Sequence, residues 1–382
     1  MQMTPRQILD KLVSFPTVSR DSNLPLVDWV EEFLDSHGIT AHRVWNADRT
    51  KASLYALAGP EVEGGIILSG HSDVVPVDGQ DWTGDPWTVC EREQRLYGRG
   101  CADMKGFVAL ALAGMAQAAK DNLARPLILA LSHDEELGCI AAPAMIEEIQ
   151  RSLPTAAAVV VGEPTMLVPV LAHKGSYGFQ VHVRGHEVHS SRMHKGVSAI
   201  MLAARLIDWA NRMNAQSAVD AVASDFDPPW TTLHVGTIAG GTAENITARD
   251  CRFGLSMRVM PTDDPQVWIR RIRDEAARLE AEARNVHPDA SITITATHHV
   301  PPLLPQPANA AEALMRRVLG ANDGGMVSYG TEAGQFQLAG FPAIVCGPGD
   351  IAQAHQADEY ISMEQFDRGW SMVQQLVATL RG

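Results

Sequence analysis

Residues 66–78 read IILSGHSDVVPVD, an apolar run followed by His71 and Asp73 inside a second apolar stretch. The first run has the length and composition of a buried strand, and its polar groups come where that strand ends. Because ligands bind outside the carboxyl ends of the strands in an open parallel sheet, such groups are expected to meet at one edge. Other polar groups follow similar apolar runs: Glu135 and Glu136 after 126–131, Glu163 after 156–161, and His355 after 341–346.

These apolar runs alternate with helical patterns such as residues 106–120, an order typical of an α/β domain with a mostly parallel sheet. The middle of the chain differs, because segments such as 178–183 alternate apolar and polar residues, as in antiparallel strands with one solvated face. The sequence therefore predicts a mostly parallel α/β catalytic domain with helices on both faces, interrupted by a smaller α+β lid domain. The expected boundaries are residues 1–174, 175–297 and 298–382.

Composition excludes several classes of protein. The chain has 382 residues and a net charge of −14, so no basic surface is expected to bind nucleic acid. No run of eighteen apolar residues and no secretory leader is visible, which predicts no membrane association and a cytoplasmic location. The five cysteines are odd in number and lack paired spacing, so free and mostly buried thiols are expected.

A glycine turn adds a further carboxylate to this set. In YGRGCADMKGF, residues 97–107, Asp103 stands just ahead of a predicted helix, where its two oxygens could bridge two cations. Imidazole and carboxylate without thiolate suit zinc, cobalt or manganese. Any one of these pieces is more often a solvated loop or a helix cap, but five of them at strand ends or a glycine turn indicate a metal site. Most of the other histidines are predicted to be surface or structural, including His42, His133, His182, His186, His234, His287, His298 and His299.

The segments SGHSDVVPV, GRGCADMKG, SHDEELG, VGEPT and AHQADEY resemble the metal-binding motifs of the zinc-dependent aminoacylase, desuccinylase and glutamate carboxypeptidase family. The resemblance covers almost the whole chain. It implies a phosphorylase/hydrolase-like catalytic domain with two Zn²⁺ ions per subunit, which Co²⁺ can replace. Asp103 would bridge the ions, with His71 and Glu163 on one of them and Glu136 and His355 on the other.

The same resemblance implies catalytic roles for other residues. Asp73 would orient His71 through an imidazole-to-carboxylate hydrogen bond, and Glu135 would be the general acid and base. His189 in the lid, with His194 as a weaker candidate, would stabilise the oxyanion in the partner subunit's site. A homodimer formed through the lid is therefore expected.

Substrate contacts also follow from the resemblance. Asn245 and Arg258 would bind the substrate's carboxylate, since an arginine fork matches that group. Gly330 and Thr331 would form a turn beside the substrate, and Glu332 would either face a cationic side chain or cap the following helix.

The C-terminal segments YGTEAGQF and GPGDIAQAHQADEY are most similar to family members that act on N-acetylornithine. The resemblance therefore implies that the chain removes the acetyl group from N-acetyl-L-ornithine and releases ornithine and acetate, a step of arginine biosynthesis. A succinyl-diaminopimelate desuccinylase, another N-acyl-amino-acid deacylase and a dipeptidase remain open alternatives.

Three other functions are less well supported. The glycine-rich segments do not complete the G-x-G-x-x-G pattern of a dinucleotide-binding oxidoreductase, and no G-x-S-x-G elbow of a serine hydrolase is present. A metal-binding protein without turnover would not need Glu135 beside the ligand Glu136, so an enzyme is predicted.

Overall fold

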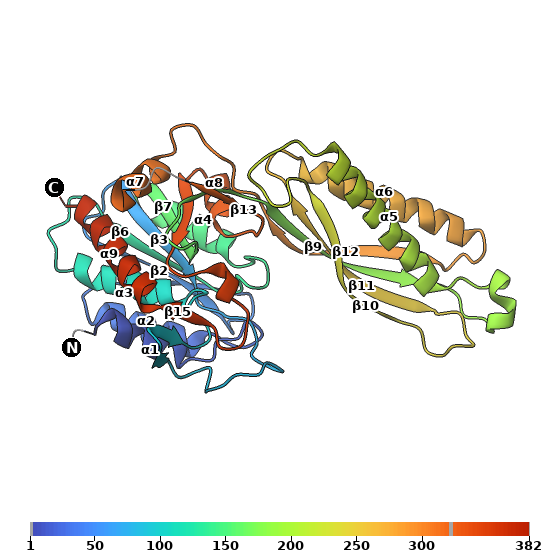
Figure 1. Ribbon diagram of the computed structural model, residues 1–382, viewed down its shortest axis with the longest axis horizontal. Helices are drawn as coiled ribbons and strands as arrows, with labels where there is room; N and C mark the ends of the chain where they lie inside the picture. The colour runs from blue at the N-terminus through green and yellow to red at the C-terminus, as the bar shows by residue number, and fades with distance from the viewer. Residues whose placement is uncertain (1–2, 321–323, 382) are drawn as a thin grey trace. The chain divides into compact units, whose positions relative to one another are not determined.

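The computed structural model describes residues 3–320 and 324–381, and the chain divides into two compact units (Figure 1). Unit 2 comprises His173–Pro302 and Val327–Gly330, and unit 1 comprises the rest of the described chain. Unit 2 is thus an insertion into unit 1, and its main segment begins and ends near the two domain boundaries expected from the sequence. The catalytic and lid roles of these units stay predictions.

Unit 1 is built around a mixed sheet that, within the described residues, has eight strands in the order β1-β2-β6-β3-β7-β14-β8-β13. The central strands β6, β3, β7 and β14 run parallel, whereas β1, β2 and β8 pair antiparallel with their neighbours. The predicted α/β fold with a large, mostly parallel sheet is confirmed. The strands are β1 (Ala41–Trp45), β2 (Ala52–Ala58), β3 (Gly65–His71), β6 (Leu127–Ser132), β7 (Ala156–Pro164), β8 (Val170–His173), β13 (Gly325–Val327) and β14 (Ala343–Gly347).

Helices cover both faces of this sheet. Ile66 and Leu68 of β3 pack into the same hydrophobic core as α3 (Lys105–Ala118), whereas Ser69 points to the opposite face and donates to Glu332 at the start of α8 (Ala333–Leu338). α3 is buried almost all round, which explains its continuous apolar sequence. The other helices of unit 1 are α1 (Pro5–Val13), α2 (Leu24–Asp35), α4 (Ala142–Ser152), α7 (Ala310–Leu319) and α9 (Met363–Thr379).

Close packing between α3 and β7 fixes the strand that carries Glu163. A Cβ atom on Gly162 would lie 2.1 Å from ring atoms of Phe107, so only glycine allows the helix to approach the strand this closely. A small second sheet pairs β15 with β5 and β5 with β4. Its strands are β4 (Cys90–Arg92), β5 (Arg95–Tyr97) and β15 (Tyr360–Ser362).

Unit 2 contains an antiparallel sheet whose described strands have the order β10-β11-β9-β12, with α5 (Ala199–Asp220) and α6 (Pro265–Arg284) beside it (Figure 1). Alternate side chains of β9, such as Phe179 and Val181, form a second hydrophobic core with residues of both helices. Gln180 between them is exposed, so the alternating sequence pattern reflects one covered and one open face. The strands are β9 (Gly175–Arg184), β10 (Thr232–Gly240), β11 (Asp250–Val259) and β12 (Ser291–Val300).

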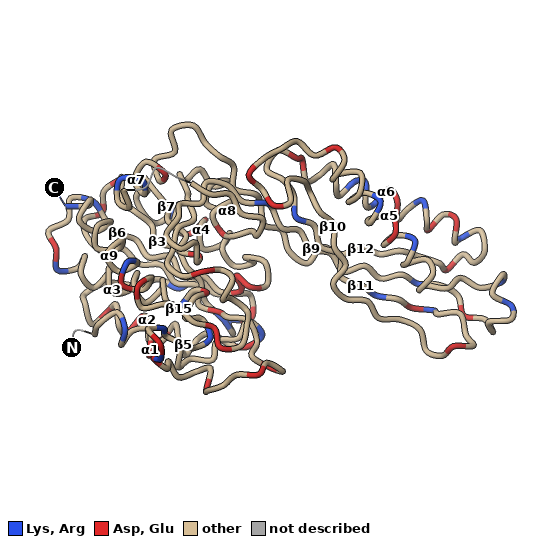
Figure 2. The backbone as a smooth tube through the Cα atoms, viewed as in Figure 1, with Lys and Arg blue, Asp and Glu red and all other residues tan. Residues whose placement is uncertain are grey.

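Acidic and basic side chains are interspersed along α5 and α6 (Figure 2). The Arg205–Glu282 ion pair links α5 to α6, and the Arg278–Glu275 pair lies within α6. Within the described residues, no helix combines the length and the apolar character needed to cross a membrane. The five cysteines are free, and all except Cys90 are buried, so the prediction made for them is confirmed.

Candidate metal centre

The polar groups that follow the apolar runs come together at one edge of the unit 1 sheet. β3 ends at His71 and lies between β6, which precedes Glu135 and Glu136, and β7, which carries Glu163. The parallel register sets the ends of these strands side by side, because Ser69 pairs with both Ala130 and Val161.

Asp103 occupies the turn before α3. In the preceding residues, Gly100 has φ +85°, and a Cβ atom there would lie 3.0 Å from Val74 Cγ1. Glycine therefore permits both the left-handed backbone and the close approach. His355 lies in the loop after β14 and the short 3-10 helix η2 (Ile351–Gln353).

Asp103 lies between two histidines. Its Oδ1 atom is 3.0 Å from His71 Nε2, and its Oδ2 atom is 3.2 Å from His355 Nε2. Glu163 Oε1 is 3.8 Å from His71 Nε2, and Glu136 Oε2 is 3.0 Å from His355 Nε2. Each histidine thus faces one oxygen of Asp103 and one further glutamate, which is the pairing expected from the sequence.

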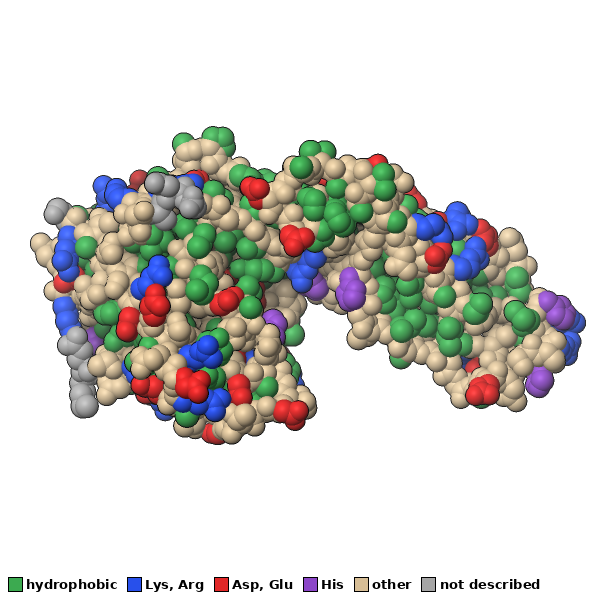
Figure 3. All heavy atoms as spheres, viewed as in Figure 1, with side chains coloured by type: hydrophobic (Ala, Val, Ile, Leu, Met, Phe, Trp, Pro, Cys, Tyr) green, Lys and Arg blue, Asp and Glu red, His purple; other side chains and the backbone are tan. Residues whose placement is uncertain are grey.

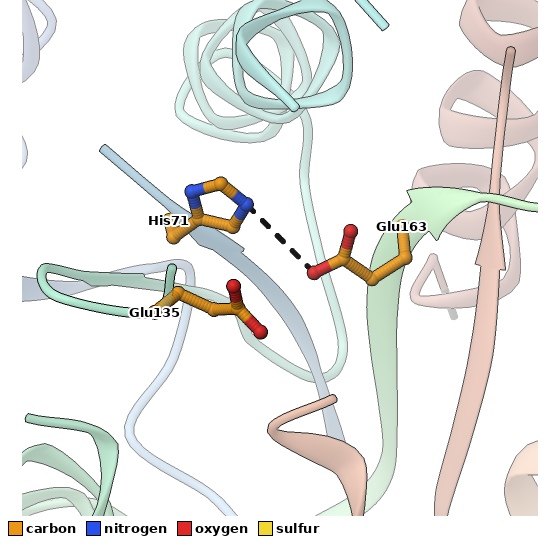
Figure 4. A group of neighbouring side chains, drawn as sticks. All are labelled: His71, Glu135 and Glu163. Atoms are coloured by element: carbon orange, nitrogen blue, oxygen red, sulfur yellow. Dashed lines mark ion pairs between the residues drawn. The ribbon is translucent and has the colours of Figure 1, made fainter. Parts of the chain in front are cut away.

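Glu135 belongs to the same cluster. One ligand atom from each of His71, Glu135 and Glu163 lies within 4.8 Å of the others, and the same holds for His71, Asp103 and Glu136. Figure 4 shows the carboxylates of Glu135 and Glu163 turned toward the same space beside the His71 ring. Because Glu135 is as close as a ligand, its predicted role in proton transfer rests on its chemistry and the resemblance.

Burial and crowding perturb the ionisation of this cluster. Burial raises the pKa of Glu135 to about 8 and that of Glu163 well above its ordinary value, and neighbouring carboxylates add to both shifts. Burial alone would lower the pKa of His71, but the hydrogen bond to Asp103 and the nearby carboxylates raise it well above the ordinary value. Hydrogen bonding to Asp103 raises the pKa of His355 to about 10. In the metal-free site, burial and crowding therefore favour protons on several of these groups, and bound cations would take the place of those protons.

These residues fit a pair of divalent metal ions. Glu136 Oε1 is buried and has no hydrogen-bond partner among the described residues, so one ligand oxygen is free to bind a cation. The donor set is imidazole nitrogen and carboxylate oxygen, which suits zinc, cobalt or manganese. Bound cations would also relieve the repulsion among the carboxylates that raises their pKa values.

Asp73 makes different contacts from those predicted. His71 Nδ1 bonds to the backbone carbonyl of Asp73 at 2.8 Å, whereas the nearest carboxylate oxygen is 3.7 Å away. The Asp73 carboxylate instead accepts from Ser19 Oγ at 2.7 Å and from the amides of Glu135 and Glu136 at 3.2 and 3.4 Å. The predicted hydrogen bond between the His71 imidazole and the Asp73 carboxylate is therefore wrong, because the loop turns the carboxylate toward the amides of Glu135 and Glu136.

Glu332 does not cap α8. Its side chain makes no capping hydrogen bond, so that alternative is wrong. Instead Oε2 accepts from Ser69 Oγ at 3.1 Å, while Oε1 has no hydrogen-bond partner within the described part of the chain. The carboxylate is 1% exposed. The neighbouring Thr331, also buried, accepts the Ala333 amide through Oγ1.

The remaining predicted site residues belong to unit 2. His189 is exposed at the start of the short 3-10 helix η1 (Ser190–Lys195), which also carries His194. Asn245 is exposed, and its backbone carbonyl accepts a hydrogen bond from the Ser190 amide at 2.8 Å, so Asn245 lies next to His189. Arg258 is exposed near the end of β11, and Gly330 belongs to the short Val327–Gly330 segment. Their approach to the metal ligands stays a prediction.

The structure reveals further side chains around the cluster. Cys139 Sγ donates to Glu135 Oε1 at 3.1 Å, and Arg99 pairs with Glu359 directly behind Asp103. Arg99 and Glu359 lie within the motifs quoted above, but their residue types alone do not distinguish them from surface charges. Ser19 lies far from every motif and carries no signal in the sequence.

Known proteins are similar to this chain over nearly all of its length. Residues 67–379 match the model of peptidase family M20/M25/M40. The chain is 36% identical to an acetylornithine deacetylase from Myxococcus xanthus, covering 99% of this chain and 97% of the relative.

Two solved structures share the fold. A metallo-carboxypeptidase from Sulfolobus solfataricus aligns with a TM-score of 0.79 at 16% identity, over 98% of each chain. A dinuclear metal-binding peptidase from Bacillus subtilis aligns with a TM-score of 0.64 at 13% identity, over 98% of this chain and 97% of that one. The chain therefore belongs to the M20/M25/M40 peptidase family and is a hydrolytic enzyme of this metal-dependent family.

Proposed function

We propose that this enzyme removes the acetyl group from N-acetyl-L-ornithine and releases ornithine and acetate. The observation that carries the chemistry is the placement of Asp103 between His71 and His355, with Glu135 beside them. The choice of substrate is supported by the full-length similarity to an acetylornithine deacetylase.

The proposed cofactor is a pair of Zn²⁺ ions, with Co²⁺ as a functional replacement. His71, Asp103 and Glu163 would hold one ion, and Asp103, Glu136 and His355 the other. When bound, such ions polarise the amide carbonyl and lower the pKa of water.

Glu135 is proposed to move the proton during hydrolysis. Its carboxylate would accept a proton from the attacking water and then donate it to the amide nitrogen as the carbon–nitrogen bond breaks. Burial favours the protonated form of Glu135, which helps this carboxyl group to hold the proton between the two steps. Asp73 would hold the Glu135 and Glu136 amides, and so aim both carboxylates into the site.

Residues of unit 2 complete the proposed site. His189 would donate a hydrogen bond to the negative charge that develops on the amide oxygen, and Arg258 and Asn245 would bind the substrate's α-carboxylate. Gly330 and Thr331 would border the substrate at the segment where the chain passes between the units.

We further propose a homodimer formed through unit 2, in which His189 serves the partner subunit's site. β10 is an edge strand, and its outer residues, including Ile238, are largely exposed. Exposed hydrophobic side chains are visible on this unit in Figure 3, and Met193 and Met201 belong to the same exposed class. A strand with one unpaired edge beside exposed apolar side chains favours pairing with a second copy of the chain.

The direct test is release of ornithine from N-acetyl-L-ornithine by zinc-reconstituted protein, with metal-stripped protein alongside. Fast release that depends on the metal is the expected result. If N-succinyl-diaminopimelate, other N-acyl amino acids or dipeptides are hydrolysed instead, the metal chemistry stands and the substrate assignment is wrong.

A further inference from the structure

A buried ion pair lies directly behind the turn that carries Asp103. Arg99 Nη1 is 2.7 Å from Glu359 Oε2, and both side chains are 1% exposed. Burying two charges is costly even when they are paired, so such a pair is weak evidence for a role in stability alone. The contacts made by each partner indicate what else it does.

Glu359 holds the backbone of the Asp103 turn. Its Oε2 atom accepts the Gly100 amide at 3.0 Å, and its Oε1 atom accepts the amides of Ala102 and Asp103 at 2.9 and 3.0 Å. A carboxylate that receives several amide hydrogens in a buried place fixes the peptide groups strongly. The position of the Asp103 side chain is therefore tied to Glu359.

Arg99 connects the same carboxylate to the His355 loop. Its Nη1 atom donates to the Gln356 carbonyl at 3.2 Å, and its Nη2 atom donates to Gln80 Oε1. Gln80 Nε2 in turn donates to the His355 carbonyl at 2.8 Å. The bonds from Arg99 and Gln80 therefore hold two successive carbonyl groups of this loop.

His355 needs this support. Its φ of +64° is a left-handed conformation that residues other than glycine adopt at a cost, and that persists only when the surroundings impose it. Hydrogen bonds to the carbonyls of His355 and Gln356 supply that constraint. The imidazole points at Asp103 and Glu136 as a consequence.

We propose that Arg99 and Glu359 are positioning residues for the metal centre, because they hold Asp103, which both proposed ions would share, and His355, which only one of them would use. This inference rests on the proposed two-metal centre. In the other half, His71 ends β3 and bonds to the Asp73 carbonyl, and Glu163 lies within β7. The pair is therefore expected to affect the two ions unequally.

The test is a titration of metal-free protein with Zn²⁺ or Co²⁺, in which calorimetry measures the affinity of each binding step. The visible spectrum of bound Co²⁺ is a second readout. In Glu359→Gln, one carboxylate oxygen becomes an amide NH₂ group. This donor would face at least one of the backbone amides that donate to the carboxylate in the wild-type protein. One of the two binding steps, the one that uses both Asp103 and His355, should lose about 10–100-fold in affinity, as is typical for an outer partner of a metal ligand. The other step shares only Asp103 and should lose a smaller factor.

Two further variants keep the test decisive. Gln80→Ala removes the link to the His355 carbonyl and one acceptor of Arg99 at a half-buried side chain, but it leaves the bonds from Glu359 to the Asp103 turn in place, so it should weaken the same step by a smaller factor. Leu376→Ala, in the core of α9, should lower the unfolding temperature without changing either binding step. An equal loss in Leu376→Ala would attribute the effect to general destabilisation and overturn the proposal.

The outcomes also separate this inference from the proposed function, because metal binding is measured without substrate. If the wild-type protein binds two ions and Glu359→Gln binds both equally well, the positioning role is wrong while the centre stands. If the wild-type protein binds a single ion, the two-metal centre fails and this inference fails with it.

Discussion

Replacing Asp73 with asparagine should disable the glutamate pair without removing any predicted metal ligand. The carboxylate accepts from Ser19 Oγ and from the amides of Glu135 and Glu136. In asparagine, one oxygen becomes an NH₂ donor, so in either orientation at least one of these amides faces another donor. The Ser19 hydroxyl can rotate and adapt, but a backbone amide cannot.

The loss of activity or metal affinity in Asp73→Asn can be estimated from these hydrogen bonds. A hydrogen bond to a charged group contributes about 1.5–3 kcal/mol, and about 1.4 kcal/mol corresponds to a factor of ten. Asp73→Asn should therefore lower kcat/KM or metal affinity by about 10- to 150-fold. The assays are hydrolysis of the best N-acyl amino acid and metal affinity in competition with a coloured chelator.

Ser19→Ala provides the matched control. It removes one donor to the Asp73 carboxylate but leaves the amides of Glu135 and Glu136 bonded, so the glutamate pair keeps its position and the loss of activity should be clearly smaller than in Asp73→Asn. The reasoning would be refuted by an Asp73→Asn enzyme with activity within twofold of wild type. A Ser19→Ala loss as large as that of Asp73→Asn would also refute it.

Three other predictions follow from the site. Glu135→Gln should keep its metal and lose about 10²–10⁴-fold in kcat, whereas Glu136→Gln should lose metal; equal metal loss in both would contradict the assigned roles, and elemental analysis decides. His189→Ala should keep its metals and fall about 10²–10³-fold in kcat, so retained turnover would argue against an oxyanion role. Burial raises the pKa of Glu332 to about 7, so this group stabilises the fold fully below pH 4.5 and loses that contribution as pH rises through 7. At about 1.4 kcal/mol per pKa unit, metal-free wild type should lose about 3 kcal/mol of unfolding free energy over this range relative to Glu332→Gln, and denaturant titrations at both pH values would show it.

The sequence was sufficient to predict that the metal-ligand candidates meet. His71, Glu135 and Glu163 each follow or end an apolar run, and parallel strands place such ends at one edge whatever the details of the loops. The inserted antiparallel sheet was also predictable, because the second half of β9, residues 179–184, alternates buried residues with more exposed ones. Both conclusions depend on local periodicity and on rules of sheet topology.

Contacts between distant loops could not be predicted in this way. Asp73 has a carbonyl and a carboxylate near His71, and only the backbone of the loop decides which of them bonds to the ring. Glu332 precedes a helix and could have capped it, but its carboxylate turns to Ser69 instead. Arg99 and Glu359 are separated by 260 positions, so no local pattern joins them.

The late position of β14 in the chain bears on how the protein is made. This strand lies between β7 and β8 in the interior of the unit 1 sheet, yet it is synthesised after all of unit 2. The four described strands of the unit 2 sheet, in contrast, all fall within one continuous stretch, residues 175–300. Pairing between distant segments carries a larger loop-closure cost and is slower. On the ribosome, we expect the inserted sheet to form while the parallel sheet still lacks β14, so that the nascent chain acquires His355, and with it the full set of predicted metal ligands, only after unit 2 has been synthesised.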